Sequence, residues 1–130
     1  MSERLRILYV DDDNDIRTIV EMALSLDPAI EVQAAGSGQA ALALLDTGLW
    51  RPDVIILDVM MPEMDGIALL AALRERPDLA ETPALFMTAR GHQSDAIRPQ
   101  LEGATGVILK PFDPIELVGT VRRLIAREMT

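Results

Sequence analysis

Charged and hydroxyl side chains directly follow four of the short apolar runs in this 130-residue sequence. Three consecutive aspartates begin at Asp11 after LRILYV, and Asp58 follows VIIL. Thr88 follows ALFM, and Lys110 follows GVIL. Grouped carboxylates repel one another and favour a bound cation, and their oxygens suit Mg²⁺. An ammonium group and a hydroxyl opposite that cation would hold a phosphoryl group, so these residues indicate phosphoryl transfer onto a carboxylate, giving an acyl phosphate.

Lys110 stands out in the composition as well as in its position. It is the only lysine among the 12 basic residues, and the other 11 are arginines. Lysine offers a compact point charge on a flexible stem, whereas arginine offers a rigid planar fork. A single lysine at the end of an apolar run therefore indicates a site that needs the compact charge.

The spacing of apolar residues predicts five strands that alternate with five helices. The expected strands are residues 5–10, 30–35, 54–57, 84–87 and 106–109. The expected helices are 16–26, 39–45, 65–74, a short one within 94–103 that Pro99 interrupts, and 114–127. Asn14 or Asp15 is expected to cap the first helix, and Asp113 the last.

This alternation predicts an α/β fold, a doubly wound five-stranded parallel sheet with helices on both faces. The length suits one domain, which we expect to span residues 1–130. Ligands of such sheets bind outside the carboxyl ends of the strands. The side chains that follow the four apolar runs are therefore expected to meet at one edge of the sheet.

Composition excludes several classes of protein. The absence of cysteine excludes disulfides, thiolate zinc sites and cysteine nucleophiles, and the single histidine, His92, argues against a Ser-His-Asp triad. The formal net charge of −9 makes direct binding to nucleic acid a poor hypothesis. The N-terminal residues form no signal peptide, and no apolar run is long enough to span a bilayer, so we expect a cytoplasmic protein without a membrane segment.

Four motifs in this order resemble the receiver domain of two-component response regulators, of the kind seen in the chemotaxis regulator. They are V-D-D-D, L-D-V-M-M-P-E-M-D-G, M-T-A and L-K-P-F, and the resemblance covers nearly the whole chain. It implies a flavodoxin-like (βα)5 three-layer sandwich with strand order 2-1-3-4-5. It also implies a signalling protein rather than an enzyme, with self-phosphorylation and slow autodephosphorylation only.

The resemblance implies roles for individual residues. Asp58 matches the phosphoacceptor. Asp11 and Asp12 match the acidic pair that binds Mg²⁺, with Asp12 the more direct ligand and Asp11 acting through water. Met60, two residues beyond the acceptor, would give its backbone carbonyl oxygen to the metal.

The remaining motifs match the part of the site that contacts the phosphoryl group. Thr88 matches the switch hydroxyl that turns toward that group, and Lys110 matches the lysine that pairs with one of its oxygens. The peptide bond before Pro111 is expected to be cis, which X–Pro bonds adopt at low cost. The loop after the acceptor matches at Pro62, Asp65 and Gly66, and Gly66 is expected to permit a close backbone approach.

The chain departs from the family pattern at three places. Val107 stands where many receivers carry the tyrosine or phenylalanine whose ring moves with the switch hydroxyl. Pro99 falls in the fourth expected helix, on the face that usually contacts output partners. Met60 and Arg90 occupy the positions that tune phosphoryl lifetime in the family.

The implied partners are a sensor histidine kinase or histidine phosphotransfer protein and a downstream protein. The protein would act as a monomer or as a phosphorylation-dependent dimer. Two alternatives share the fold type. A Mg²⁺-dependent phosphatase of the haloacid dehalogenase type needs a second aspartate where Met60 stands. A flavodoxin-like carrier needs a phosphate-binding loop where the aspartates after the first strand would repel the flavin phosphate.

Overall fold

The computed structural model describes residues 4–89 and 104–128, which form a parallel sheet and its covering helices. The strands are β1 (Leu5–Val10), β2 (Ile30–Ala35), β3 (Val54–Asp58), β4 (Ala84–Ala89) and β5 (Gly106–Lys110). The helices are α1 (Asn14–Leu24), α2 (Gly38–Asp46), α3 (Gly66–Arg74), the 3-10 turn η1 (Pro77–Leu79) and α4 (Leu117–Glu128). The helix expected within residues 94–103, with Pro99, lies outside the described residues, as do Arg90 and His92.

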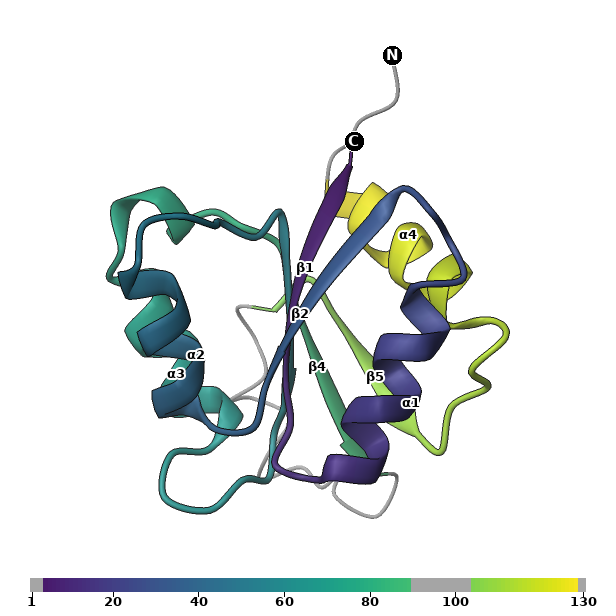
Figure 1. The fold of residues 1–130 in the computed structure, drawn as a ribbon, viewed down its shortest axis with the longest axis horizontal. Coiled ribbons are helices and arrows are strands. Elements are labelled where there is room, and N and C mark those ends of the chain that lie inside the picture. The colour runs from purple at the N-terminus through teal and green to yellow at the C-terminus, as the bar shows by residue number, and fades with distance from the viewer. Residues whose placement is uncertain (1–3, 90–103, 129–130) are drawn as a thin grey trace.

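The sheet confirms the predicted fold. Its five strands are parallel and lie in the order β2-β1-β3-β4-β5. Figure 1 shows α2 and α3 on one side of the sheet and α1 and α4 on the other. Every residue of β3 is buried, because the central strand is covered on both faces, and this explains its unbroken apolar run VIIL.

Alternation along the strands divides the core into two layers. In β1, Leu8 and Val10 face the layer under α2 and α3, while Ile7 and Tyr9 face the layer under α1 and α4. Successive side chains of a strand point to opposite faces, so residues two apart share a face. None of the helices in the described part of the chain has the length and apolar character needed to cross a membrane.

Two helices start two or more residues away from the predicted position. Helix α1 begins at Asn14 because the carboxylate of Asp13 caps it, accepting from the backbone N–H groups of Asp15 and Ile16. The expectation that Asn14 or Asp15 caps this helix was wrong. Helix α4 begins at Leu117 rather than at residue 114, because the N–H of Glu116 bonds three residues back to the carbonyl of Asp113 and forms a separate turn.

Candidate functional site

The carboxyl ends of the strands bring the predicted site residues to one edge of the sheet. Asp11 directly follows β1, Asp58 is the last residue of β3, and Lys110 is the last residue of β5. Thr88 lies within β4 rather than after it, since this strand extends to residue 89. In the register of the sheet, Asp58 is paired with Met87, so Thr88 lies one residue further toward the same edge.

Three carboxylates form a compact group at this edge. Oxygen atoms of Asp11, Asp12 and Asp58 lie within 4.8 Å of one another. Asp11 is fully buried and Asp58 is 6% exposed, whereas Asp12 is open to solvent. Hard oxygen donors with one solvent-facing side suit a small divalent cation that keeps several water ligands, so these residues fit Mg²⁺. Asp13 does not belong to this group, because its carboxylate caps α1.

Lys110 supplies the positive charge beside the two buried carboxylates. Its Nζ atom lies 3.2 Å from Oδ2 of Asp11 and 3.4 Å from Oδ1 of Asp58. The lysine side chain is only partly exposed, so this charge acts where solvent screening is reduced. The peptide bond that follows, between Lys110 and Pro111, is cis, which confirms the prediction for this bond.

Thr88 and Met60 complete the set of predicted site residues. Thr88 is almost fully buried within β4. The side chain of Met60 is half exposed, and its backbone N–H donates a hydrogen bond to the carboxylate of Asp58. The structure thus brings Met60 to Asp58 through its backbone, while its side chain faces solvent.

Sequence reasoning missed Tyr9. This side chain lies in β1 and is fully buried, and its hydroxyl donates to Oδ2 of Asp11 over 2.5 Å. Burial and the neighbouring Asp11 carboxylate both raise the pKa of the Tyr9 hydroxyl far above its usual value. The phenol therefore stays protonated and remains a donor. A signal was present in the sequence, because residues 9 and 11 share one face of the strand.

The electrostatics of the site favour a proton or a cation near Asp58. Burial, followed by the negative charge of Asp11, raises the pKa of Asp58 to about 6 in the metal-free protein. Lys110 and the N–H of Met60 act in the opposite direction and offset only part of this shift. Two carboxylates brought together away from water thus make the ionised site costly until a cation joins them.

This pKa predicts how stability depends on pH. Unfolded Asp58 titrates near 3.8 and folded Asp58 near 6, so between these values the folded state binds more protons. The contribution of Asp58 to the free energy of unfolding therefore falls as pH rises from about 4 to 6. We expect a fall on the order of 2 kcal/mol, measured by urea unfolding without divalent metal.

The variant Asp58→Asn tests this contribution, because it removes the carboxyl that titrates and keeps a side chain of nearly the same size. Its stability is expected to exceed that of the wild type at pH 7 and to approach it at pH 4. If the two proteins differ by the same amount at both pH values, the pKa of Asp58 is not raised by folding.

The backbone of Gly66 lies in close contact with the backbone of Asp58. The N–H of Gly66, the first residue of α3, donates to the carbonyl of Val59, and a Cβ atom on Gly66 would lie 2.3 Å from the carbonyl oxygen of Asp58. The prediction that Gly66 permits a close approach is therefore confirmed. Because backbone rather than a flexible side chain blocks this position, a larger residue must displace the end of β3 that carries Asp58.

We expect Gly66→Ala to destabilise the protein by about 2–3 kcal/mol and to displace Asp58. A matched control is Gly119→Ala in α4, where a Cβ meets nothing within 4 Å. That change is expected to stabilise by about 0.5–1 kcal/mol, because alanine favours helix. Urea unfolding measures both, and equal small effects would refute the close contact.

Comparison with known proteins identifies the family to which this doubly wound fold belongs. The family model of the response regulator receiver domain matches residues 7–122. The chain therefore belongs to the receiver-domain family of two-component response regulators, whose members accept a phosphoryl group on aspartate. The phosphatase and flavodoxin alternatives are not favoured.

Individual relatives give the extent of the similarity. The transcriptional regulatory protein TrcR of Mycobacterium tuberculosis is 38% identical over 123 residues, covering 95% of this chain and 46% of TrcR. Response regulator Rre1 of Synechocystis is 37% identical over 128 residues, covering 98% of this chain and 54% of Rre1. The chain thus spans about half the length of these curated relatives. The structure of the chemotaxis response regulator CheY4 of Vibrio cholerae is similar with a TM-score of 0.80 and 36% identity, over 93% of this chain and 98% of CheY4.

Proposed function

We propose that Asp58 is the phosphoacceptor of this receiver and that Lys110 and Thr88 assist the transfer. The observation that carries this proposal is the position of the Asp58 carboxylate, which shares the acidic group with Asp11 and Asp12 and lies 3.4 Å from Nζ of Lys110. The ammonium of Lys110, together with a cation bound by the acidic group, would place positive charge where the anionic transition state of phosphoryl transfer develops.

In the proposed reaction a carboxylate oxygen of Asp58 attacks the phosphorus atom of a phosphohistidine. The new P–O bond forms as the P–N bond breaks, and the histidine nitrogen leaves with the electron pair and takes up a proton. Lys110 pairs with one phosphoryl oxygen, and the Thr88 hydroxyl donates to another. Water later hydrolyses the acyl phosphate, which returns the carboxylate and inorganic phosphate.

The metal in this proposal is Mg²⁺, which the carboxylates of Asp12 and Asp58, the backbone carbonyl of Met60 and, through water, the carboxylate of Asp11 would hold. When bound, it supplies positive charge to the phosphoryl oxygens. The protein itself places the nucleophilic oxygen of Asp58, holds the Lys110 ammonium beside that oxygen and keeps Asp11 away from solvent.

Incubation with acetyl phosphate, with and without Mg²⁺, tests this function. Mass spectrometry of the intact protein is expected to show one added phosphoryl group only with the metal, and its loss over time at neutral pH. Failure to accept any phosphoryl group from this donor would contradict the proposal.

An apolar groove beside the site suits the phosphodonor protein. Its lining residues come from α1, from the turn that follows it and from the turn before α4: Ile19, Met22, Ala23, Leu26, Pro114 and Ile115. Met22 is 67% exposed and Ile115 76% exposed. Residues 19 and 22 of α1 and residue 26 in the turn after it follow helical spacing and form a stripe that a partner helix can contact.

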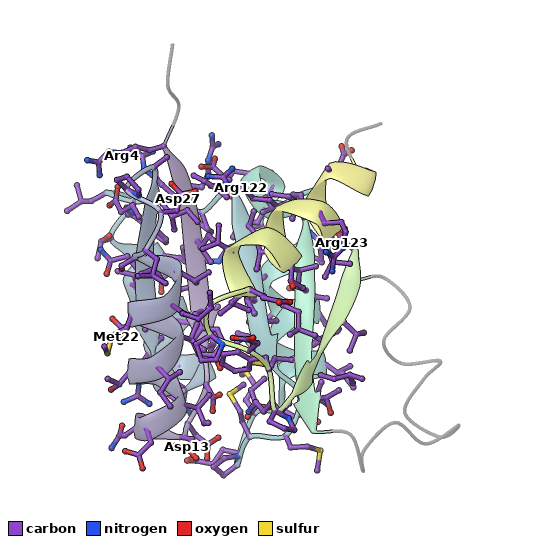
Figure 2. The ribbon with its side chains drawn as sticks, turned by 90° about the vertical axis from the view of Figure 1, so that its right-hand side faces the viewer. Arg4, Asp13, Met22, Asp27, Arg122 and Arg123 are labelled. Carbon is purple, nitrogen blue, oxygen red and sulfur yellow. The ribbon has the colours of Figure 1, made fainter. Side chains whose placement is uncertain are left out.

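Both sides of the groove are connected along the chain to the phosphoacceptor edge. Helix α1 begins three residues after Asp11, and the turn holding Ile115 follows shortly after Lys110. Figure 2 shows Asp13 near the site end of α1 and Met22 further along the same helix. We therefore propose that a helix of a histidine kinase or histidine phosphotransfer protein binds here and presents its phosphohistidine to Asp58. These partners place the chain in the cytoplasm, and a downstream protein would read its phosphorylated state.

The double variant Met22→Ser, Ile115→Ser tests the groove. Transfer from a phosphorylated histidine phosphotransfer domain is expected to slow about tenfold or more, since removing exposed anchors from an interface costs about 1 kcal/mol or more each. Labelling by acetyl phosphate should be unchanged. Leu49→Ser, at an 89% exposed position outside the groove, is the control. Equal slowing with both donors would exclude a docking role.

A further inference from the structure

Tyr9 is the only tyrosine of the chain, and its position differs from that of an ordinary core residue. Its ring packs in the apolar layer under α1 and α4 and is fully buried. Its hydroxyl reaches the edge of the sheet, 2.5 Å from Oδ2 of Asp11 and 3.5 Å from the sulfur of Met87. Packing alone would be served equally well by phenylalanine, so the hydroxyl calls for an explanation.

The hydrogen bonds of Asp11 show what the hydroxyl does. Oδ1 of this buried carboxylate accepts from the backbone N–H of Asp13 over 3.0 Å. Oδ2 accepts from Tyr9 and also from Nζ of Lys110, which is 3.2 Å away. The Tyr9 hydroxyl and the Lys110 ammonium thus share one oxygen, and hydrogen bonds to a charged group are the stronger kind.

We propose that Tyr9 is a positioning residue for the metal site: its hydroxyl holds the carboxylate of Asp11 beside Asp12 and Asp58 and shares that carboxylate with Lys110, which also pairs with Asp58. This inference rests on the proposed Mg²⁺ site. It adds to that site a residue of β1 whose buried ring lies in the layer under α1 and α4, where no ligand or substrate would touch it.

Removal of the Tyr9 hydroxyl changes the surroundings of Asp11 in two ways. Among the hydrogen bonds of the described residues, Lys110 is then the one remaining side-chain donor to Oδ2 of Asp11. The ammonium is drawn toward Asp11 and away from Asp58, and the Asp11 carboxylate can rotate because one of its supports is missing. The rotation disperses the oxygen atoms that the cation needs together, and the shift of the ammonium weakens its ion pair with Asp58.

The test is a titration of Tyr9→Phe and wild type with Mg²⁺ alone, followed by calorimetry or amide NMR shifts. The variant keeps the buried ring, so the packing of β1 is retained. We expect the dissociation constant for Mg²⁺ to rise roughly tenfold, the lower end of what loss of a hydrogen bond to a metal-ligating carboxylate usually costs. The matched control is Ile7→Val, which alters the same strand, face and apolar layer without reaching Asp11.

A second measurement needs no variant. With a single tyrosine, ¹³C-labelled tyrosine gives one Cζ signal, which reports on the hydrogen bond of the hydroxyl. This signal is expected to shift as Mg²⁺ saturates the wild type, because the cation competes for the electron density of Asp11. A tyrosine that only fills space would not respond to the metal.

The outcomes separate this inference from the function on which it rests. Weaker Mg²⁺ binding in Tyr9→Phe, unchanged binding in Ile7→Val and a responsive Cζ signal support it. Binding within about twofold of wild type in Tyr9→Phe, or equal weakening in both variants, overturns the role of Tyr9 and leaves the proposed function intact. Absence of saturable Mg²⁺ binding in the wild type overturns both.

Discussion

Replacing Asp58 with asparagine is expected to abolish covalent phosphorylation by acetyl phosphate, lowering the labelled fraction below detection. The amide has no anionic oxygen to attack phosphorus, and its nitrogen cannot replace the oxygen that faces the other carboxylates. Asp11 is a poor substitute nucleophile, because it is fully buried and is held by three hydrogen-bond donors, including Tyr9 and Lys110. Intact-protein mass spectrometry with Mg²⁺ present measures the labelled fraction.

The control makes the same chemical change at an exposed position. Asp46→Asn, at the end of α2, breaks a surface ion pair with Arg76 and should leave labelling at the wild-type level. Because Asp58→Asn relieves the repulsion with Asp11, the variant is expected to be folded and more stable at pH 7. Undiminished labelling of a folded Asp58→Asn protein would therefore move the acceptor to another carboxylate.

The sheet could be predicted from the sequence because its strands have clear patterns. The run VIIL has the length of a strand and an apolar residue at every position, which only a strand covered on both faces requires. Once parallel strands are inferred, their carboxyl ends must meet, so Asp11, Asp58 and Lys110 were expected together without any knowledge of tertiary contacts. The solitary lysine strengthened that expectation.

The contacts within the site were harder to predict, because they depend on side-chain length and on where each strand ends. Asp12 and Asp13 are neighbouring residues of the same type, so the sequence alone does not distinguish them. Because α1 begins at Asn14, Asp13 caps the helix and Asp12 lies beside Asp11. Tyr9 was counted with the apolar residues of its strand, since periodicity records the ring and not the reach of the hydroxyl. The turn before α4 was likewise hidden, because Pro114 suits the first turn of a helix as well as an isolated turn.

A second large effect is expected for Lys110→Gln, which should slow phosphorylation by acetyl phosphate about a hundredfold or more. Lys110 is the cation that forms ion pairs with both Asp11 and Asp58 among the described residues. Removing one preorganised group that stabilises developing charge typically costs two to three orders of magnitude in rate. The loss also leaves two buried carboxylates unpaired, so the variant should be less stable by about 3 kcal/mol at pH 7 without metal. The phosphorylation rates of the variant and the wild type are therefore compared with Mg²⁺ present. A separate unfolding measurement under the same conditions shows that the variant is folded.

Arg122→Gln provides the matched loss of one positive charge. Arg122 forms an ion pair with Asp27 at 2.8 Å, and Figure 2 shows both at the end of the molecule opposite Asp13. Its loss changes net charge equally and should leave the phosphorylation rate within about twofold, since an exposed charge at that distance is screened. Lys110→Arg separates charge from shape, because a guanidinium retains the charge but is planar and larger than the ammonium. If Lys110→Arg is phosphorylated at the full rate, any positive charge is sufficient at this edge. If it remains slow, the compact ammonium beside Asp11 and Asp58 is itself required. The single lysine of this arginine-rich chain indicates the second outcome.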